Sequence, residues 1–223
     1  MNVETAIEKA PVSSRVTKRA VVDNQPTALT NIYEDDVNMA VWQRQLSKKF
    51  IDAADNILIN KPQLHQSIIV SPHDAYFKVN RVLGNTQSST ILCEDITELV
   101  AMFCYLFEVE HVGLRLTVLK RAMCPRFHVD RIPCRLITTY RGVATQWLAQ
   151  DKINREHLGT HLPDEQSKLF NHISDIQSLY QGDVALMKGE YWEGNEGGGL
   201  VHRSPQVPKK YSRLLLTLDF IDD

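Results

Sequence analysis

The second half of the chain most constrains its fold, because it consists of short β-type runs separated by turn signals. Apolar and polar residues alternate over 114–123, and further short runs follow at 126–142, 145–150, 182–189, 199–205 and 211–220. Runs of this length, rich in β-branched and aromatic residues, are typical of strands. Several such runs in succession predict a barrel or a double sheet.

The first half of the chain predicts helices that pack on one outer face of these strands. The segments 34–60 and 93–113 repeat apolar residues at helical spacing. Helices followed by a run of strands indicate an α+β protein that is mainly β. The expected fold is therefore a jelly roll, with a helical buttress over 34–110 and a barrel over 114–223.

The expected domain organisation is one domain over 31–223 behind a flexible lead-in over 1–30, because those first residues are polar and contain two prolines. The formal net charge of −2 gives no electrostatic argument for binding nucleic acid or an anionic membrane. Without a long apolar run or a signal pattern, a cytoplasmic location is the default expectation. The expected partner is a small-molecule or protein substrate that the sequence does not identify.

The stretch RFHVDRIP places two metal-ligating residue types two positions apart. His128 and Asp130 fall on one face of an extended segment. An imidazole and a carboxylate that converge in this way are two of the three ligands in the facial triad that holds Fe(II) and leaves positions open. The pair alone occurs often by chance, so a third ligand is required from elsewhere.

Two downstream residues strengthen the metal-site interpretation. His202 ends a β-type run in GLVHRSP, and Arg213 begins the strand RLLLTLDF, where it shares a face with Thr217. An arginine that starts a barrel strand and faces inward requires an anion, and a dicarboxylate co-substrate is one candidate. Taken together with His128 and Asp130, these residues favour a metal site over separate core residues.

The four cysteines leave a zinc site open without requiring one. No two of them form a C-x-x-C pair, which argues against a zinc ribbon. Cys124 and Cys134 bracket the His-x-Asp pair, so zinc held by Cys, His and Asp ligands is conceivable. Two small buried hydrophobic residues are the favoured interpretation.

The glycine-rich stretch KGEYWEGNEGGGL (188–200) matches no phosphate-binding motif. The sequence leaves two interpretations open for it. It is either a flexible turn between two strands or a lid over a site.

The order of these motifs resembles the core of the Fe(II)/2-oxoglutarate-dependent dioxygenases, and most closely their prolyl-hydroxylase-like branch. The matching features are His128-x-Asp130, RLITTY (135–140), GVAT (142–145), GDVAL (182–186), HRSP (202–205) and RLLLTL (213–218). The turn at 142–145 has one glycine fewer than the family pattern, and 151–181 is an insertion. Both departures leave the three candidate metal ligands intact, but with them the sequence does not identify the substrate.

The resemblance implies a double-stranded β-helix, of the cupin-like jelly-roll type, over roughly 120–220. It implies an oxygenase of the hydroxylase type, whose catalytic centre is Fe(II) held by His128, Asp130 and His202. It further implies that Arg213 binds the co-substrate 2-oxoglutarate. Two residues are then candidates for a hydrogen bond to that co-substrate, namely Tyr140 and Thr138.

The stretches 124–142, 182–205 and 213–220 also resemble an uncharacterised bacterial family, domain of unknown function 1826, over most of the chain. Members of this family have gene neighbours that handle zinc, which implies an alternative function. In that alternative the protein is a non-catalytic, cupin-like zinc protein of metal homeostasis. A metal-free barrel that serves as an interaction module is a third hypothesis.

Overall fold

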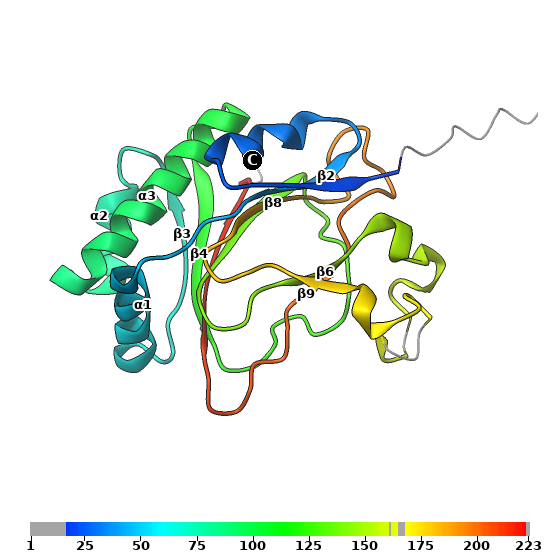
Figure 1. The fold of residues 1–223 in the computed structure, drawn as a ribbon. Helices are drawn as coiled ribbons and strands as arrows, with labels where there is room; N and C mark the ends of the chain where they lie inside the picture. The colour runs from blue at the N-terminus through cyan, green and yellow to red at the C-terminus, as the bar shows by residue number, and fades with distance from the viewer. Residues whose placement is uncertain (1–16, 161, 165–167, 222–223) are drawn as a thin grey trace, which may run out of the picture.

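A seven-stranded sheet forms the centre of the fold, with helices on one side and a smaller sheet on the other (Figure 1). The computed structural model describes residues 17–160, 162–164 and 168–221. The strands of the large sheet, in spatial order, are β1 (Arg19–Asp23), β2 (Val37–Trp42), β8 (Val184–Lys188), β5 (Cys134–Arg141), β10 (Arg213–Asp219), β4 (Val112–Leu119) and β3 (His65–Val70). Among the strand pairs of this sheet in the described residues, only β1–β2 is parallel.

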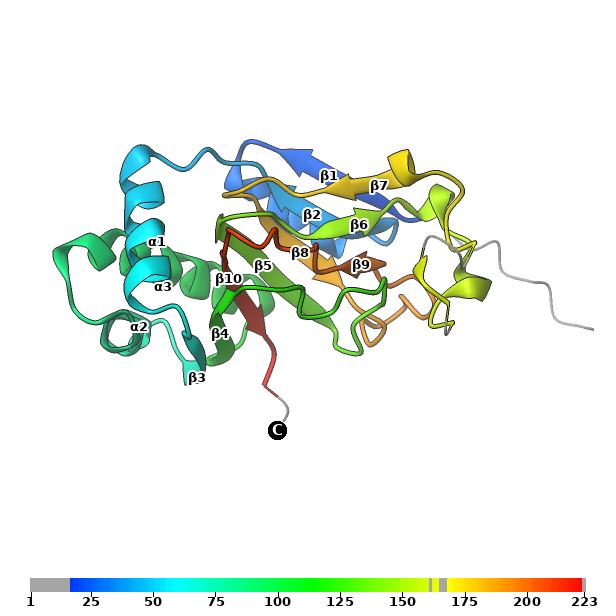
Figure 2. The same cartoon turned by 90° about the horizontal axis from the view of Figure 1, so that it is seen from below.

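The small sheet lies opposite the central strands of the large sheet (Figure 2). It contains, in spatial order, β7 (Ile176–Ser178), β6 (Gln146–Leu148) and β9 (His202–Arg203), which pair in antiparallel fashion. An isolated antiparallel bridge between His128 and His202 extends it by one short segment. This bridge places the first predicted metal ligand directly beside the third.

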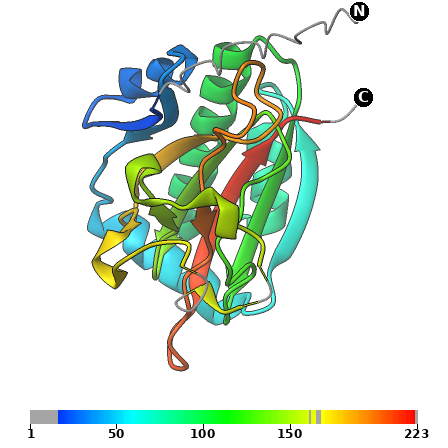
Figure 3. The same cartoon turned by 90° about the vertical axis from the view of Figure 1, so that its right-hand side faces the viewer.

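The helices cover the outer face of the large sheet, so that α3 lies on the far side of β10 in Figure 3. Their bounds are α1 (Lys48–Asn60), α2 (Ala75–Leu83) and α3 (Gln87–Phe107), and the 3-10 segment η1 (Pro26–Tyr33) adds to this layer. Thr86 caps the N-terminus of α3, since its hydroxyl accepts a hydrogen bond from the Ser89 amide. Glu108 caps the C-terminus of α3 in the left-handed conformation.

The two faces of β10 separate the core from the site, as its alternation predicts. Leu214, Leu216 and Leu218 are buried against the helices. Arg213 and Leu215 turn to the opposite face, toward the small sheet. The strand therefore joins a purely apolar layer to a layer that carries functional groups.

Three sequence predictions for the first half of the chain are wrong in part. The helix predicted over 34–60 begins only at Lys48, because Val37–Trp42 forms a buried strand. The helix predicted over 93–113 occupies Gln87–Phe107. The lead-in predicted over 1–30 contains β1, which pairs with β2, while residues 1–16 lie outside the described residues.

The mixed α+β class with its sheet-rich second half is as predicted from the sequence. Within the described ranges, no helix has the length and apolar character needed to cross a bilayer.

Candidate metal centre

Backbone pairing brings the two histidines together. The His128 amide donates to the His202 carbonyl, and the His202 amide donates to the His128 carbonyl, each at 3.0 Å. Residues that exchange both hydrogen bonds across an antiparallel pair project their side chains to the same face. The imidazole rings accordingly lie with their centroids 4.6 Å apart.

Hydrogen bonds to backbone carbonyls orient both imidazole rings. Nδ1 of His128 lies 2.9 Å from the Arg126 carbonyl, and Nδ1 of His202 lies 3.1 Å from the Leu200 carbonyl. A carbonyl only accepts, so each Nδ1 carries the proton and each Nε2 is left with its lone pair. This is the tautomer that a metal-binding histidine requires.

Asp130 lies two positions after His128 in the chain and faces both imidazoles. Its Oδ1 lies 3.5 Å from Nε2 of His128, and its Oδ2 lies 3.5 Å from Nε2 of His202. Arg135 holds the carboxylate in place, since its Nη1 donates to Oδ2 at 2.5 Å. Asp219 in turn pairs with Arg135 at 2.6 Å. The three predicted metal ligands are thus brought together by the fold.

The surroundings keep Asp130 ionised. Burial by itself raises the pKa of this carboxyl, but the neighbouring imidazoles of His128 and His202 and the charge of Arg135 outweigh burial and bring the pKa far below its usual range. For His128, burial lowers the pKa, and the neighbouring Asp130 carboxylate reverses this and raises it. An anionic carboxylate beside two imidazoles is the protonation pattern that favours a bound cation.

The donor set fits a divalent metal ion. Two ligands that bind one ion at about 2.1 Å each lie no more than about 4.2 Å apart, and both 3.5 Å separations satisfy this limit. The ligand atoms of His128, Asp130 and His202 all lie within 4.8 Å of one another. Two histidines and one carboxylate match the facial triad of non-haem iron sites, and zinc accepts the same ligands.

The cysteines do not join this cluster in the described part of the chain. Cys134 is fully buried in the core between β5 and the helices, as the favoured interpretation of a small buried hydrophobic residue predicts, and it is not placed to be a zinc ligand. Burial also raises the pKa of its thiol far above the usual range. Cys124 is exposed and lines the same pocket as the histidines, but it is not one of the clustered ligands.

Arg213 lies in the same pocket as His128 and His202 and is 1 % exposed. Its guanidinium donates only to hydroxyl groups: to Thr139 at 2.9 Å, to Thr145 at 2.7 Å and to Ser204 at 3.4 Å. Within the described ranges, no carboxylate lies within ion-pair distance. Burial lowers the pKa of Arg213 to about 10. A buried cation without a counter-ion is a site prepared for an anionic ligand.

Tyr140 and Thr138 do not face this pocket, which corrects the sequence prediction at both positions. The Tyr140 hydroxyl donates to Asp95 at 2.6 Å, in the layer between β5 and the helices. Thr138 lies two positions away on the same face of the strand, and its buried hydroxyl has no partner. The residues that contact Arg213 instead include Thr139, which the sequence analysis missed by one position.

The pocket is lined by fourteen residues: Arg115, Thr117, Met123, Cys124, His128, Arg135, Ile137, Thr145, His202, Arg203, Ser204, Arg213, Leu215 and Thr217. Its cavity volume is only about 60 Å³. Met123 on this lining is 42 % exposed.

The glycine-rich segment 188–200 is bonded to the segment that carries Asp130. The Glu190 amide donates to the Asp130 carbonyl at 2.8 Å, and the Gly189 amide donates to the Pro133 carbonyl at 2.8 Å. A side chain at Gly189 would lie 2.1 Å from the Ile132 carbonyl oxygen. Glycine is required there for close backbone contact, which supports a structural clamp rather than a freely moving lid.

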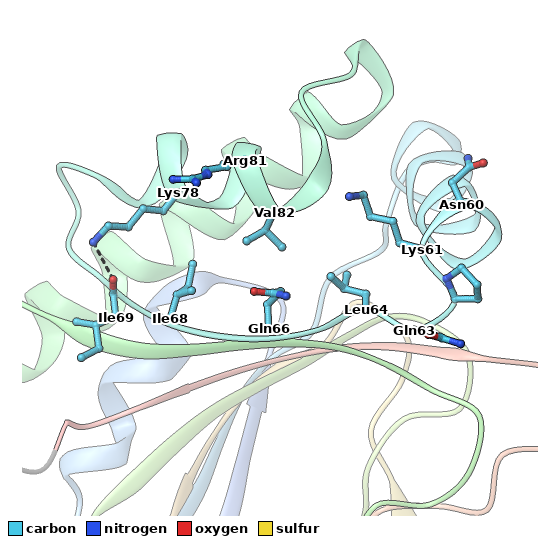
Figure 4. A pocket seen from close by; sticks show the side chains of 11 residues that line it. Asn60, Lys61, Gln63, Leu64, Gln66, Ile68, Ile69, Lys78, Arg81 and Val82 are labelled. Atoms are coloured by element: carbon cyan, nitrogen blue, oxygen red, sulfur yellow. Dashed lines mark hydrogen bonds between the residues drawn. The ribbon is translucent and has the colours of Figure 1, made fainter.

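A larger cavity lies elsewhere, beside β3, α2 and the end of α1 (Figure 4). It is about 870 Å³, and no predicted site residue lines it. Lys78 donates to the Ile69 carbonyl at its rim, which satisfies an edge group of the sheet. Size alone therefore does not locate the chemistry of this protein.

Fold and site define a class: a sheet-rich α+β protein with a His-Asp-His cluster, both histidines of which line one pocket with a buried arginine that has no ion pair among the described residues. The chain belongs to the family described as "Protein of unknown function (DUF1826)", whose model matches residues 23–219. No curated protein matches the sequence.

Several solved structures are similar to the chain at low identity. A prolyl-4-hydroxylase from Pseudomonas putida shares 10% identity, with 88% of this chain and 98% of that chain covered and a TM-score of 0.45. A dioxygenase for auxin oxidation from rice shares 10% identity over 92% and 83% of the two chains, with a TM-score of 0.48. HygX from Streptomyces hygroscopicus, with nickel and 2-oxoglutarate bound, shares 9% identity over 87% and 85%, with a TM-score of 0.40. Likeness at this level carries no weight for function, which must be argued from the site.

Proposed function

We propose that this protein is an Fe(II)- and 2-oxoglutarate-dependent oxygenase of the hydroxylase type. One observation carries the proposal: His128 and His202 of the His128, Asp130 and His202 cluster line the same pocket as the buried Arg213, which has no carboxylate partner among the described residues. The three metal ligands would bind a cation. The unpaired arginine would bind an anion, namely a co-substrate of the reaction. A purely structural metal site has no need for such an arginine.

The sheet arrangement supports a double-stranded β-helix. Four adjacent strands of the large sheet, β8, β5, β10 and β4, face four segments of the small one, which are β7, β6, β9 and the bridge at His128. All of these pairs are antiparallel. Eight segments in two facing antiparallel sheets are what a jelly roll requires.

Each residue then has a role that its surroundings allow. When bound, iron would supply the oxygen activation that side chains cannot perform. His128, Asp130 and His202 hold the metal, and Arg135 fixes the Asp130 carboxylate. Arg213 binds the distal carboxylate of 2-oxoglutarate, and burial strengthens this interaction by excluding water.

The first test is an anaerobic titration. Metal-stripped protein receives Fe(II) and then 2-oxoglutarate, and the visible charge-transfer band of the chelated complex is recorded. We expect a band for the wild type, no band for His202→Ala, and an unchanged band for His111→Ala, since His111 is exposed and lies outside the cluster. If the wild type binds Fe(II) but shows no band, the proposal is refuted.

Zinc is the alternative cation, because the same three ligands accept it. Cys124 lines the pocket and is the residue that a zinc-handling function would recruit. Zinc retention that is lost in Cys124→Ser, together with no response to 2-oxoglutarate, would favour a metal-homeostasis function. Zinc retention that is unchanged in this variant would remove the support for that alternative.

A further inference from the structure

Four arginine side chains line the metal pocket, and two of them have no acidic partner. Arg135 and Arg203 form ion pairs with aspartates of the chain. Arg213 donates only to hydroxyls, and Arg115 makes no hydrogen bond or ion pair in the described part of the chain. The pocket therefore carries one cationic side chain more than 2-oxoglutarate accounts for.

Arg115 is placed in the pocket by the alternation of β4. Leu114 and Leu116 on either side of it are buried against the helices, so Arg115 turns toward the small sheet, where it is half-buried. Thr117 follows on the same face and also lines the pocket. A half-buried guanidinium is partly desolvated, so its lack of a counter-ion favours the binding of an anion.

Thr217 gives a second, independent indication at the same place. It pairs with Arg115 across the β10–β4 ladder and lines the same pocket. Its hydroxyl oxygen is buried and has no hydrogen-bond partner among the residues that the structure describes. Buried hydroxyls without partners are rare, and one beside an unpaired arginine is suited to donate to an anionic oxygen.

This position is separate from the predicted co-substrate site. In the ladder, Arg213 pairs with Leu119 and Thr217 pairs with Arg115, so the two places are four residues apart. At about 3.3 Å per residue, this corresponds to roughly 13 Å along the strand. Both carboxylates of 2-oxoglutarate are already assigned, one to Arg213 and one to the metal, and none remains for Arg115.

We propose that the substrate of this protein carries an anionic group, a carboxylate or a phosphate, which Arg115 and Thr217 bind at the end of the pocket away from Arg213. The inference rests on the proposed function, because it assigns Arg213 to 2-oxoglutarate. Substrates without an acidic group leave Arg115 unpaired and are disfavoured. The substrate is thus selected by charge at the end of the pocket where the co-substrate does not bind.

The experiment uses the full chain loaded with Ni(II) and 2-oxoglutarate, which does not turn over. Acetate and methyl phosphate are titrated separately at constant ionic strength, and binding is followed by calorimetry. We expect at least one of them to bind the wild type, and to bind about tenfold more weakly to Arg115→Gln, since a charge-assisted hydrogen bond is lost. Thr217→Val should show a smaller loss, and Arg121→Gln, an exposed position, should show none.

Which probe responds identifies the anion as a carboxylate or a phosphate. Binding of neither probe, or equal binding to wild type and Arg115→Gln, would overturn the inference. A loss of 2-oxoglutarate affinity in Arg115→Gln would also overturn it, because Arg115 would then belong to the co-substrate site. Failure of the wild type to bind 2-oxoglutarate refutes the proposed function instead, and the same titrations with Ni(II) alone still test Arg115.

Discussion

At the scale of single residues, Arg213 shows a conflict between stability and binding. Its buried guanidinium meets three hydroxyls and no carboxylate among the described residues, and burial lowers its pKa to about 10. A buried charge that is retained without an ion pair contributes little to folding. The arginine is therefore explained by a ligand and not by the core.

Replacement of this arginine by methionine tests that explanation. In Arg213→Met, the relief of a buried charge offsets the hydroxyl groups left without a donor, so the free energy of unfolding of the unliganded protein should change by less than about 1 kcal/mol. Affinity for 2-oxoglutarate should fall about a hundredfold, because at least two charge-assisted hydrogen bonds are lost. Denaturant unfolding and calorimetry measure the two quantities. A loss of stability of several kcal/mol would identify Arg213 as structural.

Tyr140 and Thr139 form a second residue-scale test, because they lie on opposite faces of β5. Tyr140→Phe removes a buried hydrogen bond to Asp95, so stability should fall by about 1–2 kcal/mol while 2-oxoglutarate affinity stays constant. Thr139→Val removes the hydroxyl that orients Arg213, and that affinity should fall roughly tenfold. The opposite pattern of affinities would show that the strand is assigned to the wrong face.

At the scale of elements, the wrong predictions for β5 and β2 share one physical cause. Strand β5 is buried on both faces, so its composition does not tell which face meets the site, and the choice of Thr138 and Tyr140 failed. Strand β2 is also a nearly continuous buried apolar run, and such a run cannot be distinguished from a helix by periodicity. By contrast, β10 carries an arginine on an otherwise leucine-rich strand, and its two faces were predicted correctly.

The clamp made by the glycine-rich segment gives an element-scale prediction. Gly189→Ala places a methyl group 2.1 Å from the Ile132 carbonyl oxygen and 2.6 Å from the Asp130 carbonyl oxygen, so the segment that carries the ligand Asp130 must shift. We expect a stability loss of about 1–3 kcal/mol and metal affinity at least tenfold weaker. Metal titration and thermal melting measure both effects.

Gly194 provides the matched control in the same segment. It has a φ of +74°, but a side chain there meets no atom within 4 Å. Gly194→Ala should therefore lose about 1 kcal/mol of stability from backbone strain alone and keep full metal affinity. If both variants lose metal affinity equally, the glycine-rich segment acts through its flexibility and not through contact with the backbone at Asp130.

At the scale of the whole molecule, the site joins residues that are far apart in sequence. The His-x-Asp pair, His202 and Arg213 were found in the sequence because their chemistry is unusual on strands. Arg115 was not, because an arginine on a strand is ordinarily a solvated side chain. Its significance depends on the absence of a partner within the described ranges, and only the three-dimensional arrangement shows that.

Linkage between the ligands gives a prediction for the whole molecule. Each ligand that binds only the native state stabilises it, by about 2.7 kcal/mol at a hundred times its Kd. For a chain of 223 residues, this corresponds to a rise in Tm of roughly 5–10 °C. Chelation of the metal should therefore lower Tm by that amount in the wild type and in His111→Ala, and should leave the Tm of His202→Ala unchanged.

The same melting experiment tests whether metal and co-substrate share one site. If 2-oxoglutarate binds partly through the metal and partly through Arg213, its affinity must increase when the metal is present, and by reciprocity it must increase the affinity for the metal. The rise in Tm with both ligands should then exceed the sum of the separate rises, and Arg213→Met should abolish the excess. A 2-oxoglutarate effect of equal size in chelated protein would place the co-substrate away from the His128, Asp130 and His202 cluster.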